Sequence, residues 1–97
     1  MSDYIFHPEA AEEYANAYEW YAKRSLRIAD EFEREIERAL RLITNTPETW
    51  PKYDDQHRYF LIRKFPFSII YRIFNERIYV IAVAHGSRRP NYWKNRE

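Results

Sequence analysis

The stretch FPFSIIYRIFNERIYVIAVAHGSRRPNYW, residues 65–93, decides the fold of this 97-residue chain. Apolar side chains alternate along residues 67–74 and again along residues 77–84, at the two-residue period of a β-strand. Asn75 and Glu76 separate the two runs, and Asn tolerates the positive φ that a tight hairpin turn needs. The stretch therefore predicts two antiparallel strands in the middle of a sheet.

Both faces of these two strands carry large apolar side chains, so neither face can lie wholly in water. Strict alternation places Ile81, Val83 and His85 on one face of the second strand. Ala82 and Ala84 then lie on the other face. We expect helices to cover one face, and a partial lid, a partner chain or a second copy of the protein to cover the other.

The first half of the chain has helical periodicity instead. Tyr14, Tyr18 and Tyr21 recur at four- and three-residue steps, which predicts one apolar stripe on a helix over residues 8–24. A short apolar run at residues 4–6 precedes this helix. It is too short for a helix and predicts an edge strand.

A second helix follows almost without a linker. Ser25 is a favourable N-cap, and the helix should end near Asn45 because Thr46 precedes a proline and is disfavoured in the helical region. Two helices joined so closely form an antiparallel hairpin. The apolar stripe of the second helix consists of Ile28, Ala29, Phe32, Ile36, Ala39, Leu40 and Ile43.

Residues 47–57 contain two prolines and little periodicity, and predict a loop in which Trp50 packs against the helices. A strand over residues 58–64 follows, and Pro66 marks the turn into the next strand. The predicted class is therefore α+β, with an N-terminal edge strand and an antiparallel two-helix hairpin packed on a mainly antiparallel sheet, in the order β-α-α-β-β-β. We expect residues 1–97 to form a single domain, because no linker or repeat interrupts them.

Composition excludes several kinds of site. The chain has no Cys, so it can form neither disulfides nor a thiolate metal site, and its single Gly excludes a glycine-rich phosphate-binding loop. His7 and His57 do not have metal-ligand spacing, so we expect no metal and no cofactor. The apolar runs are too short to span a membrane and the first residues show no signal-peptide pattern. We expect a cytoplasmic protein that does not associate with membranes.

The two halves of the chain carry opposite charge. Residues 1–57 hold 7 Lys or Arg and 13 Asp or Glu, whereas residues 58–97 hold 9 and 2, so that −6 and +7 sum to the net charge of +1. A basic half suggests an anionic partner. Alternatively, the two halves neutralise each other within the fold.

The segment that follows the last predicted strand concentrates guanidinium, imidazole and aromatic groups after a bend at Gly86. Guanidinium groups bind carboxylate or phosphate oxygens, and aromatic rings stack on bases or fill a partner's pocket. Alternatively, the two aromatic residues at 92 and 93 fold back over the sheet while the Arg side chains are solvated. The candidate residues for binding a target or a partner protein are Arg63, Arg72, His85, Arg88, Arg89, Tyr92 and Trp93.

His85 invites a catalytic interpretation because imidazole titrates near neutral pH. No acidic residue lies near it in the sequence to orient the ring, and Ser68 and Ser87 are ordinary strand and turn serines. A histidine at a strand end is more often a hydrogen-bonded structural residue. We therefore assign no catalytic residue from spacing.

The segments FPFSIIYRI, IAVAH and RRPNYW, together with the order of the predicted elements, resemble the RelE/ParE superfamily of type II toxin–antitoxin toxins. The resemblance extends from His7 to Trp93. It implies a small α+β toxin that inhibits growth and is held silent by a cognate antitoxin lying along a groove. It also implies a toxin–antitoxin hetero-oligomer, whereas the incompletely covered apolar sheet leaves a homodimer open.

The superfamily has two main activities. RelE-like members are ribosome-dependent ribonucleases that cut mRNA, whereas ParE-like members bind and poison DNA gyrase. Positions at which the nucleases carry basic side chains are held here by Tyr59, Leu61 and Ser68. RNA cleavage needs proton transfer and stabilisation of a more negative transition state. A sheet centre with few Arg side chains would lose much of that electrostatic stabilisation. The resemblance therefore favours a ParE-like inhibitor of gyrase.

Two alternatives stay open from the sequence. In the first, the chain is an mRNA endoribonuclease in which Arg72 and Arg89 hold the phosphate and His85 or Tyr92 acts as acid or base. In the second, the fold serves only as a basic nucleic-acid-binding module.

Overall fold

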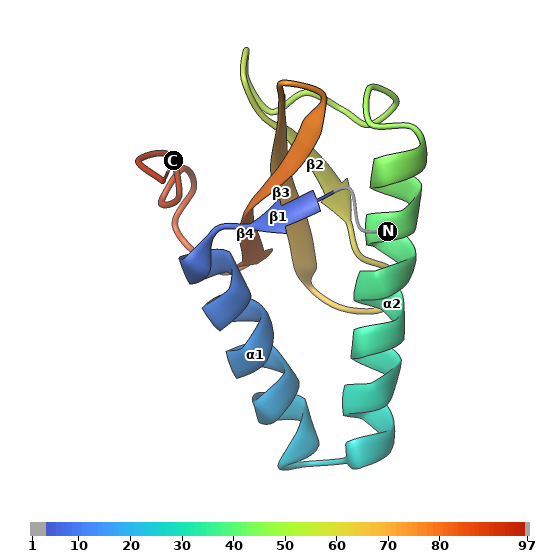
Figure 1. Ribbon diagram of the computed structural model, residues 1–97. Helices are drawn as coiled ribbons and strands as arrows, with labels where there is room; N and C mark the ends of the chain where they lie inside the picture. The colour runs from blue at the N-terminus through green and yellow to red at the C-terminus, as the bar shows by residue number, and fades with distance from the viewer. Residues whose placement is uncertain (1–3, 97) are drawn as a thin grey trace.

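The computed structural model describes residues 4–96, and its helices and strands follow the predicted α+β order (Figure 1). The class and the order β-α-α-β-β-β are confirmed. The elements are β1 (Tyr4–Phe6), α1 (Pro8–Ala22), α2 (Leu26–Asn45), β2 (Arg58–Leu61), β3 (Phe67–Phe74) and β4 (Arg77–His85).

Both helices begin at side-chain caps. His7 Nδ1 accepts the N–H of Glu9 at 3.0 Å before α1, and Ser25 Oγ accepts the N–H of Ile28 at 3.3 Å before α2. Pro8 takes the first position of α1, where its missing N–H leaves no helical hydrogen bond unmade. Local sequence therefore sets both helix starts.

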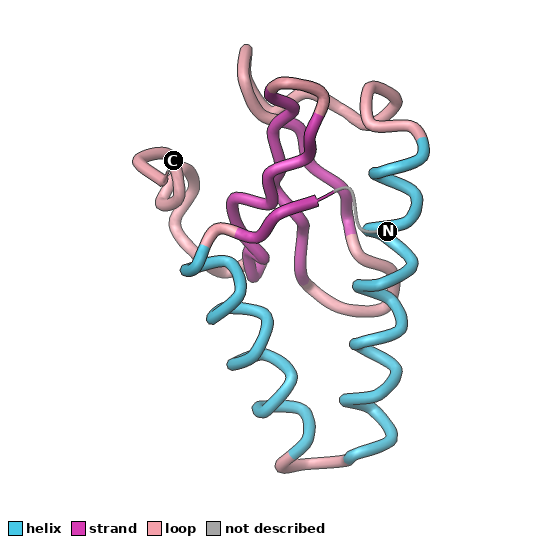
Figure 2. The backbone as a smooth tube through the Cα atoms, viewed as in Figure 1, coloured by secondary structure: helices cyan, strands magenta, loops and turns pink. Residues whose placement is uncertain are grey.

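The connection between the helices is tight. α1 ends at Ala22, before the predicted end at residue 24, because the N–H groups of Arg24 and Ser25 both bond to the carbonyl of Tyr21. The helices diverge from this connection toward the sheet (Figure 1). The strands gather at the other end of the hairpin, so the connection projects beyond the sheet (Figure 2). Within residues 4–96, no helix combines the length and apolarity that crossing a membrane would require.

The sheet has the strand order β1-β4-β3-β2, with β1 parallel to β4 and the other neighbours antiparallel. β1 pairs only with the first part of β4, from Ile78 to Val80. The later residues of β4 have no neighbouring strand on that side among the residues described. This short β1 leaves a free sheet edge beside α1.

A β-bulge in β4 breaks the predicted alternation. The register shifts between Ile70 and Tyr71 of β3, so Ile81 of β4 has no partner of its own. Ile81 and Ala82 consequently both pack on the face away from the helices, whereas Val83 belongs to the helix-side core. The predicted grouping of Ile81 with Val83 is therefore wrong, because one extra residue reverses every later side chain.

The main core lies between the hairpin and the sheet. Its largest fully buried side chains include Phe32 and Ile36 of α2 and Tyr71 of β3, whose hydroxyl donates to the carbonyl of Pro47 at 2.7 Å. Burial raises the pKa of Tyr71 to about 12. A smaller apolar cluster on the opposite face contains Ile70, Ile81, Ala82 and Trp93.

The loop before β2 and the end of β2 complete the helix-side layer. Trp50 packs on Phe60 with ring centroids 4.7 Å apart, and its Nε1 donates to the carbonyl of Leu42 at 3.4 Å, which confirms its predicted place against the helices. β2 ends at Leu61 and not at the predicted residue 64. The chain turns in the residues that follow, where Lys64 adopts a φ of 70°.

Candidate functional site

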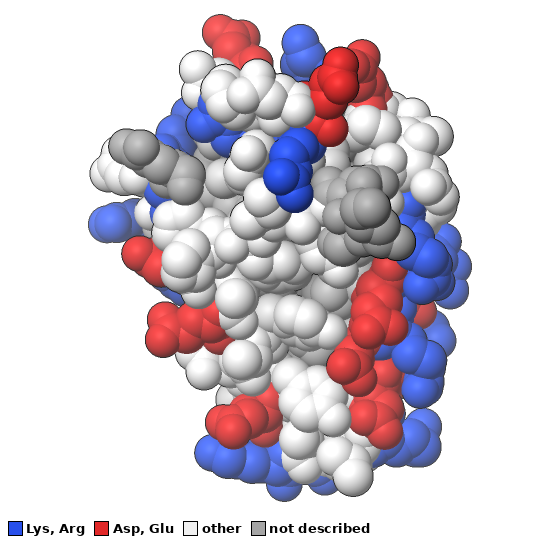
Figure 3. Space-filling view, in the orientation of Figure 1, with Lys and Arg blue, Asp and Glu red and all other residues white. Residues whose placement is uncertain are grey.

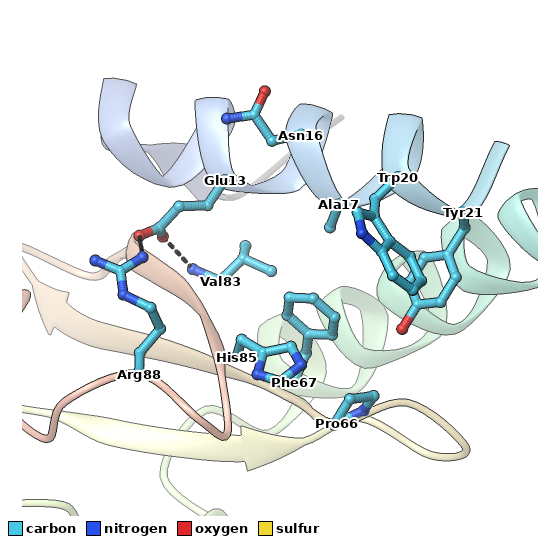
Figure 4. A pocket seen from close by; sticks show the side chains of 10 residues that line it. All are labelled: Glu13, Asn16, Ala17, Trp20, Tyr21, Pro66, Phe67, Val83, His85 and Arg88. Atoms are coloured by element: carbon cyan, nitrogen blue, oxygen red, sulfur yellow. Dashed lines mark hydrogen bonds and ion pairs between the residues drawn. The ribbon is translucent and has the colours of Figure 1, made fainter. Parts of the chain in front are cut away.

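A groove with a volume of about 600 Å³ opens between α1 and the ends of β3 and β4 (Figure 4). Its lining is mostly apolar, with charged groups at one end. We call it the α1–β4 groove. Its lining residues are Glu13, Asn16, Ala17, Trp20, Tyr21, Pro66, Phe67, Val83, His85 and Arg88.

The bulge and the small residues of α1 create this groove. Because of the bulge, Val83 and His85 face α1, and Ala17 offers only a methyl group opposite them. Trp20 is 54% exposed at the groove, although it is a large apolar side chain. The guanidinium of Arg24 lies 3.6 Å from the ring centroid of Trp20 and holds the ring in place. The groove is thus preformed and unfilled by the protein's own side chains.

Glu13 closes one end of the groove and bonds to three residues, one in β4 and two near the C-terminus. Its Oε1 accepts the N–H of Val83 at 2.9 Å and Nη1 of Arg96 at 3.0 Å. Its Oε2 accepts the hydroxyl of Tyr92 and Nη2 of Arg96, both at 2.8 Å. Burial alone would raise the pKa of Glu13, but the hydrogen bonds from Arg96, Tyr92 and Val83 outweigh it and hold this pKa below its usual value.

The same cluster seals the free edge of β4. Val83 donates its N–H to the Glu13 side chain, and the carbonyl of Ile81 accepts Nη1 of Arg96 at 3.0 Å. Side chains thus replace the neighbouring strand that β1 is too short to provide. Burial and the adjacent Glu13 carboxylate raise the pKa of Tyr92 above its usual value, so its hydroxyl remains a donor.

Residues 86–96, which we call the C-terminal segment, fold back across the sheet face away from the helices. Trp93 is 2% exposed, and its ring lies 4.8 Å from that of His57 and 4.9 Å from that of Tyr53. Nζ of Lys94 lies 3.0 Å from Oδ2 of Asp54. The alternative expectation, in which the aromatic residues cover the sheet, therefore describes Trp93. In this structure its ring is an internal packing group and offers no surface to a target.

His85 is held by its own turn. Its Nδ1 accepts the N–H of Ser87 at 2.9 Å, the Oγ of Ser87 lies 2.8 Å away, and the ring meets Phe67 edge to face. No carboxylate among residues 4–96 bonds to this ring. The arrangement is that of a structural histidine in the wall of the groove.

Many basic side chains of the second half pair with acidic side chains of the first. Arg63 Nε lies 3.9 Å from Glu35, and Lys64 Nζ lies 2.9 Å from Glu31. With Arg88, Lys94 and Arg96, five basic residues of this half form such ion pairs. Figure 3 shows acidic and basic side chains side by side over α2. The alternative of mutual neutralisation therefore holds for these residues, and Arg63 points its charge at α2.

Arg72 lies in a second cavity of about 470 Å³, which is also lined by Arg58 and His57. Its Nε is buried and makes no hydrogen bond within residues 4–96. Arg72 and His85 thus line separate cavities, and Arg89 is exposed on the C-terminal segment. The structure does not gather the candidate nuclease residues around one point.

Sequence reasoning missed Glu13, Arg96 and Trp20. In the sequence Glu13 is one of several acidic residues near the start of a helix, and no local pattern connects it to Arg96. Trp20 could have been found, because Arg24 follows it at the four-residue step that brings helical side chains together. An aromatic ring and a guanidinium in that register favour an exposed, ordered contact group.

Comparison with known proteins agrees with this architecture. A family model described as "ParE toxin of type II toxin-antitoxin system, parDE" matches residues 4–90. A solved structure described as "Chromosomal ParDE TA system from P. aeruginosa" superposes with a TM-score of 0.68 at 14% sequence identity, covering 88% of this chain and 96% of that one. No curated protein sequence matches significantly. The structural likeness supports the fold, and the family model covers most of the chain. The predicted resemblance to ParE-like toxins is therefore confirmed. The chain belongs to the ParE toxin family of type II toxin–antitoxin systems.

Proposed function

We propose that this ParE-family toxin inhibits DNA gyrase in the cytoplasm and is silenced by a cognate antitoxin that occupies the α1–β4 groove. Gyrase is the target that the resemblance to ParE-like toxins implies. The arrangement of the candidate residues supports a binding protein over a nuclease, because Arg72 and His85 lie in separate cavities and His85 has no carboxylate partner among residues 4–96.

The single observation that carries the antitoxin part is the exposed Trp20 in a preformed apolar groove. Trp and Arg dominate the binding energy of protein interfaces, and Arg24 already fixes the Trp20 ring. Tyr21 and Phe67 continue the apolar surface inside the groove. A partner that covers these rings buries apolar surface, which favours binding. Because the rings are already ordered, little conformational entropy of the toxin is lost.

The target surface is proposed to be separate from the groove. Arg89 is exposed, and its side chain makes no ion pair within residues 4–96, so its guanidinium is available to an acidic surface of the target. Trp93 and Lys94 hold the C-terminal segment that presents Arg89. In this proposal Trp93 packs beneath the C-terminal segment and Tyr92 bonds to Glu13. Both contacts keep Arg89 in position without touching the target.

Inducible expression in bacteria tests the target. We expect plasmids to lose negative supercoiling and the DNA damage response to rise while translated mRNA stays intact. Rapid cutting of translated mRNA with normal supercoiling would instead assign the chain to the nuclease activity. An absence of any toxicity at normal expression would leave only a binding module.

Co-expression with the product of the adjacent open reading frame tests the silencing partner. We expect that product to restore growth and to co-purify with the toxin as a hetero-oligomer. The matched variants are Trp20→Ala, which should weaken co-purification, and Leu26→Ala, an exposed apolar residue outside the groove, which should not.

A further inference from the structure

The guanidinium of Arg88 stands at the mouth of the α1–β4 groove without a hydrogen bond to any of residues 4–96. The nearest carboxylate oxygen, Oε2 of Glu13, lies 3.8 Å from Nη1, which is beyond hydrogen-bond distance (Figure 4). The Arg88 side chain is 51% exposed. Its charge and its donors are therefore accessible from the groove.

Glu13 cannot take up these donors, because its acceptor capacity is already used. A carboxylate offers about four lone-pair sites. Val83, Tyr92 and Arg96 fill them with four hydrogen bonds of 2.8 to 3.0 Å. Arg96 also reaches the largely exposed Glu9 at 3.1 Å. Arg88 is therefore left with only the longer ion pair to Glu13, at 3.8 Å, and its guanidinium donors make no hydrogen bond within residues 4–96.

Arg88 is nevertheless held in position. Its Cζ lies 3.8 Å from the ring centroid of Tyr92, and Glu13 fixes that ring through the Tyr92 hydroxyl. The Arg88 N–H also bonds to the carbonyl of His85 at 3.0 Å. An ordered guanidinium loses less entropy than a free one when it binds a carboxylate.

We propose that the α1–β4 groove selects a partner segment that combines apolar side chains with one carboxylate, and that Arg88 binds this carboxylate. The inference rests on the proposed antitoxin role of the groove and states the chemistry of its occupant. The carboxylate meets Arg88 beside Glu13, and an apolar side chain meets Trp20. Those two residues of α1 are seven positions apart, which is about 10 Å along the helix. The acidic and apolar groups of the partner should have that spacing.

Selection from a random display library of short peptides tests this preference without knowledge of the natural partner. The full-length protein is the bait, with Arg88→Ala and, as the matched control, Arg77→Ala, an exposed arginine outside the groove. We expect wild type and Arg77→Ala to enrich peptides with an acidic residue about 10 Å from an apolar cluster. Arg88→Ala should lose the acidic preference and keep the apolar one. The enriched peptide should bind Arg88→Ala about tenfold more weakly than wild type.

A second measurement keeps the test independent of how the variant folds. The enriched peptide is resynthesised with its acidic residue changed to the amide, and its binding to wild type should weaken about tenfold. Enrichment of the same acidic consensus by Arg88→Ala, equal binding of acid and amide, or no enrichment by wild type would each overturn the inference. A failure to inhibit gyrase would contradict the proposed target and would leave these binding results unaffected.

Discussion

Glu13 and Arg96 lie 83 positions apart in the sequence and are joined by two hydrogen bonds of 3.0 and 2.8 Å. Their side chains are 15% and 10% exposed. This pair ties the C-terminal segment to α1, seals the free edge of β4 and leaves the Arg88 guanidinium at the groove with only a 3.8 Å ion pair to Glu13. Three features of the molecule therefore depend on one carboxylate.

Replacement of Arg96 by Ala should release the C-terminal segment. The loss of charge-assisted hydrogen bonds by a largely buried carboxylate should lower the free energy of unfolding by about 2–4 kcal/mol. Hydrogen exchange should become faster at the amides of Val83 and Tyr92, and Arg89→Ala serves as the control with unchanged exchange. Equal protection in both variants would show that the segment is held by its aromatic contacts alone.

The contribution of Glu13 should depend on pH. Its pKa is held below the usual value of 4.5 in the folded chain, so its ionised form stabilises the fold at pH values above 4.5. This stabilisation should disappear as the pH falls through the lowered pKa. Chemical unfolding across neutral to acidic pH should show the free-energy gap between wild type and Glu13→Gln shrinking in acid. A gap that widens in acid would contradict the assignment.

Truncation of two tryptophans should affect different properties, stability for one and binding for the other. Trp93→Ala removes a ring that is 2% exposed and should lower the free energy of unfolding by about 3–5 kcal/mol. Trp20→Ala removes a ring that is 54% exposed and should change it by less than about 1 kcal/mol while weakening antitoxin binding. Thermal melting and a pull-down measure the two effects. A large stability loss for Trp20→Ala would assign that ring to the core.

Replacement of Arg89 by Ala should reduce toxicity and leave the fold intact, because the side chain is exposed and makes no ion pair within residues 4–96. Arg77→Ala, an exposed arginine at the start of β4, is the control and should stay toxic. Growth after induction and circular dichroism of the purified variants provide the readouts. Undiminished toxicity at normal expression would remove Arg89 from the target surface.

The helices and the central strands could be predicted because their information is local. The apolar stripe of α2, the Ser25 cap and the two-residue period of β3 each specify structure within a few residues. The bulge at Ile81 could not be predicted, because an extra residue inside a continuous apolar run leaves no mark on the pattern.

The site was less predictable because it joins distant segments. The concentration of Arg, His and aromatic residues at 85–93 predicts a contact segment, but the sequence does not say whether Trp93 faces a partner or the sheet. That choice depends on Tyr53 and His57, which come from a loop without periodicity. The link between Glu13 and Arg96 is likewise a tertiary contact.

The most direct test of the account is a supercoiling assay with purified toxin, gyrase, ATP and relaxed plasmid, with and without purified antitoxin. The account predicts that the toxin lowers supercoiling, that antitoxin restores it, and that Trp20→Ala toxin still inhibits but is poorly rescued. Full supercoiling in the presence of folded, antitoxin-free toxin would contradict it.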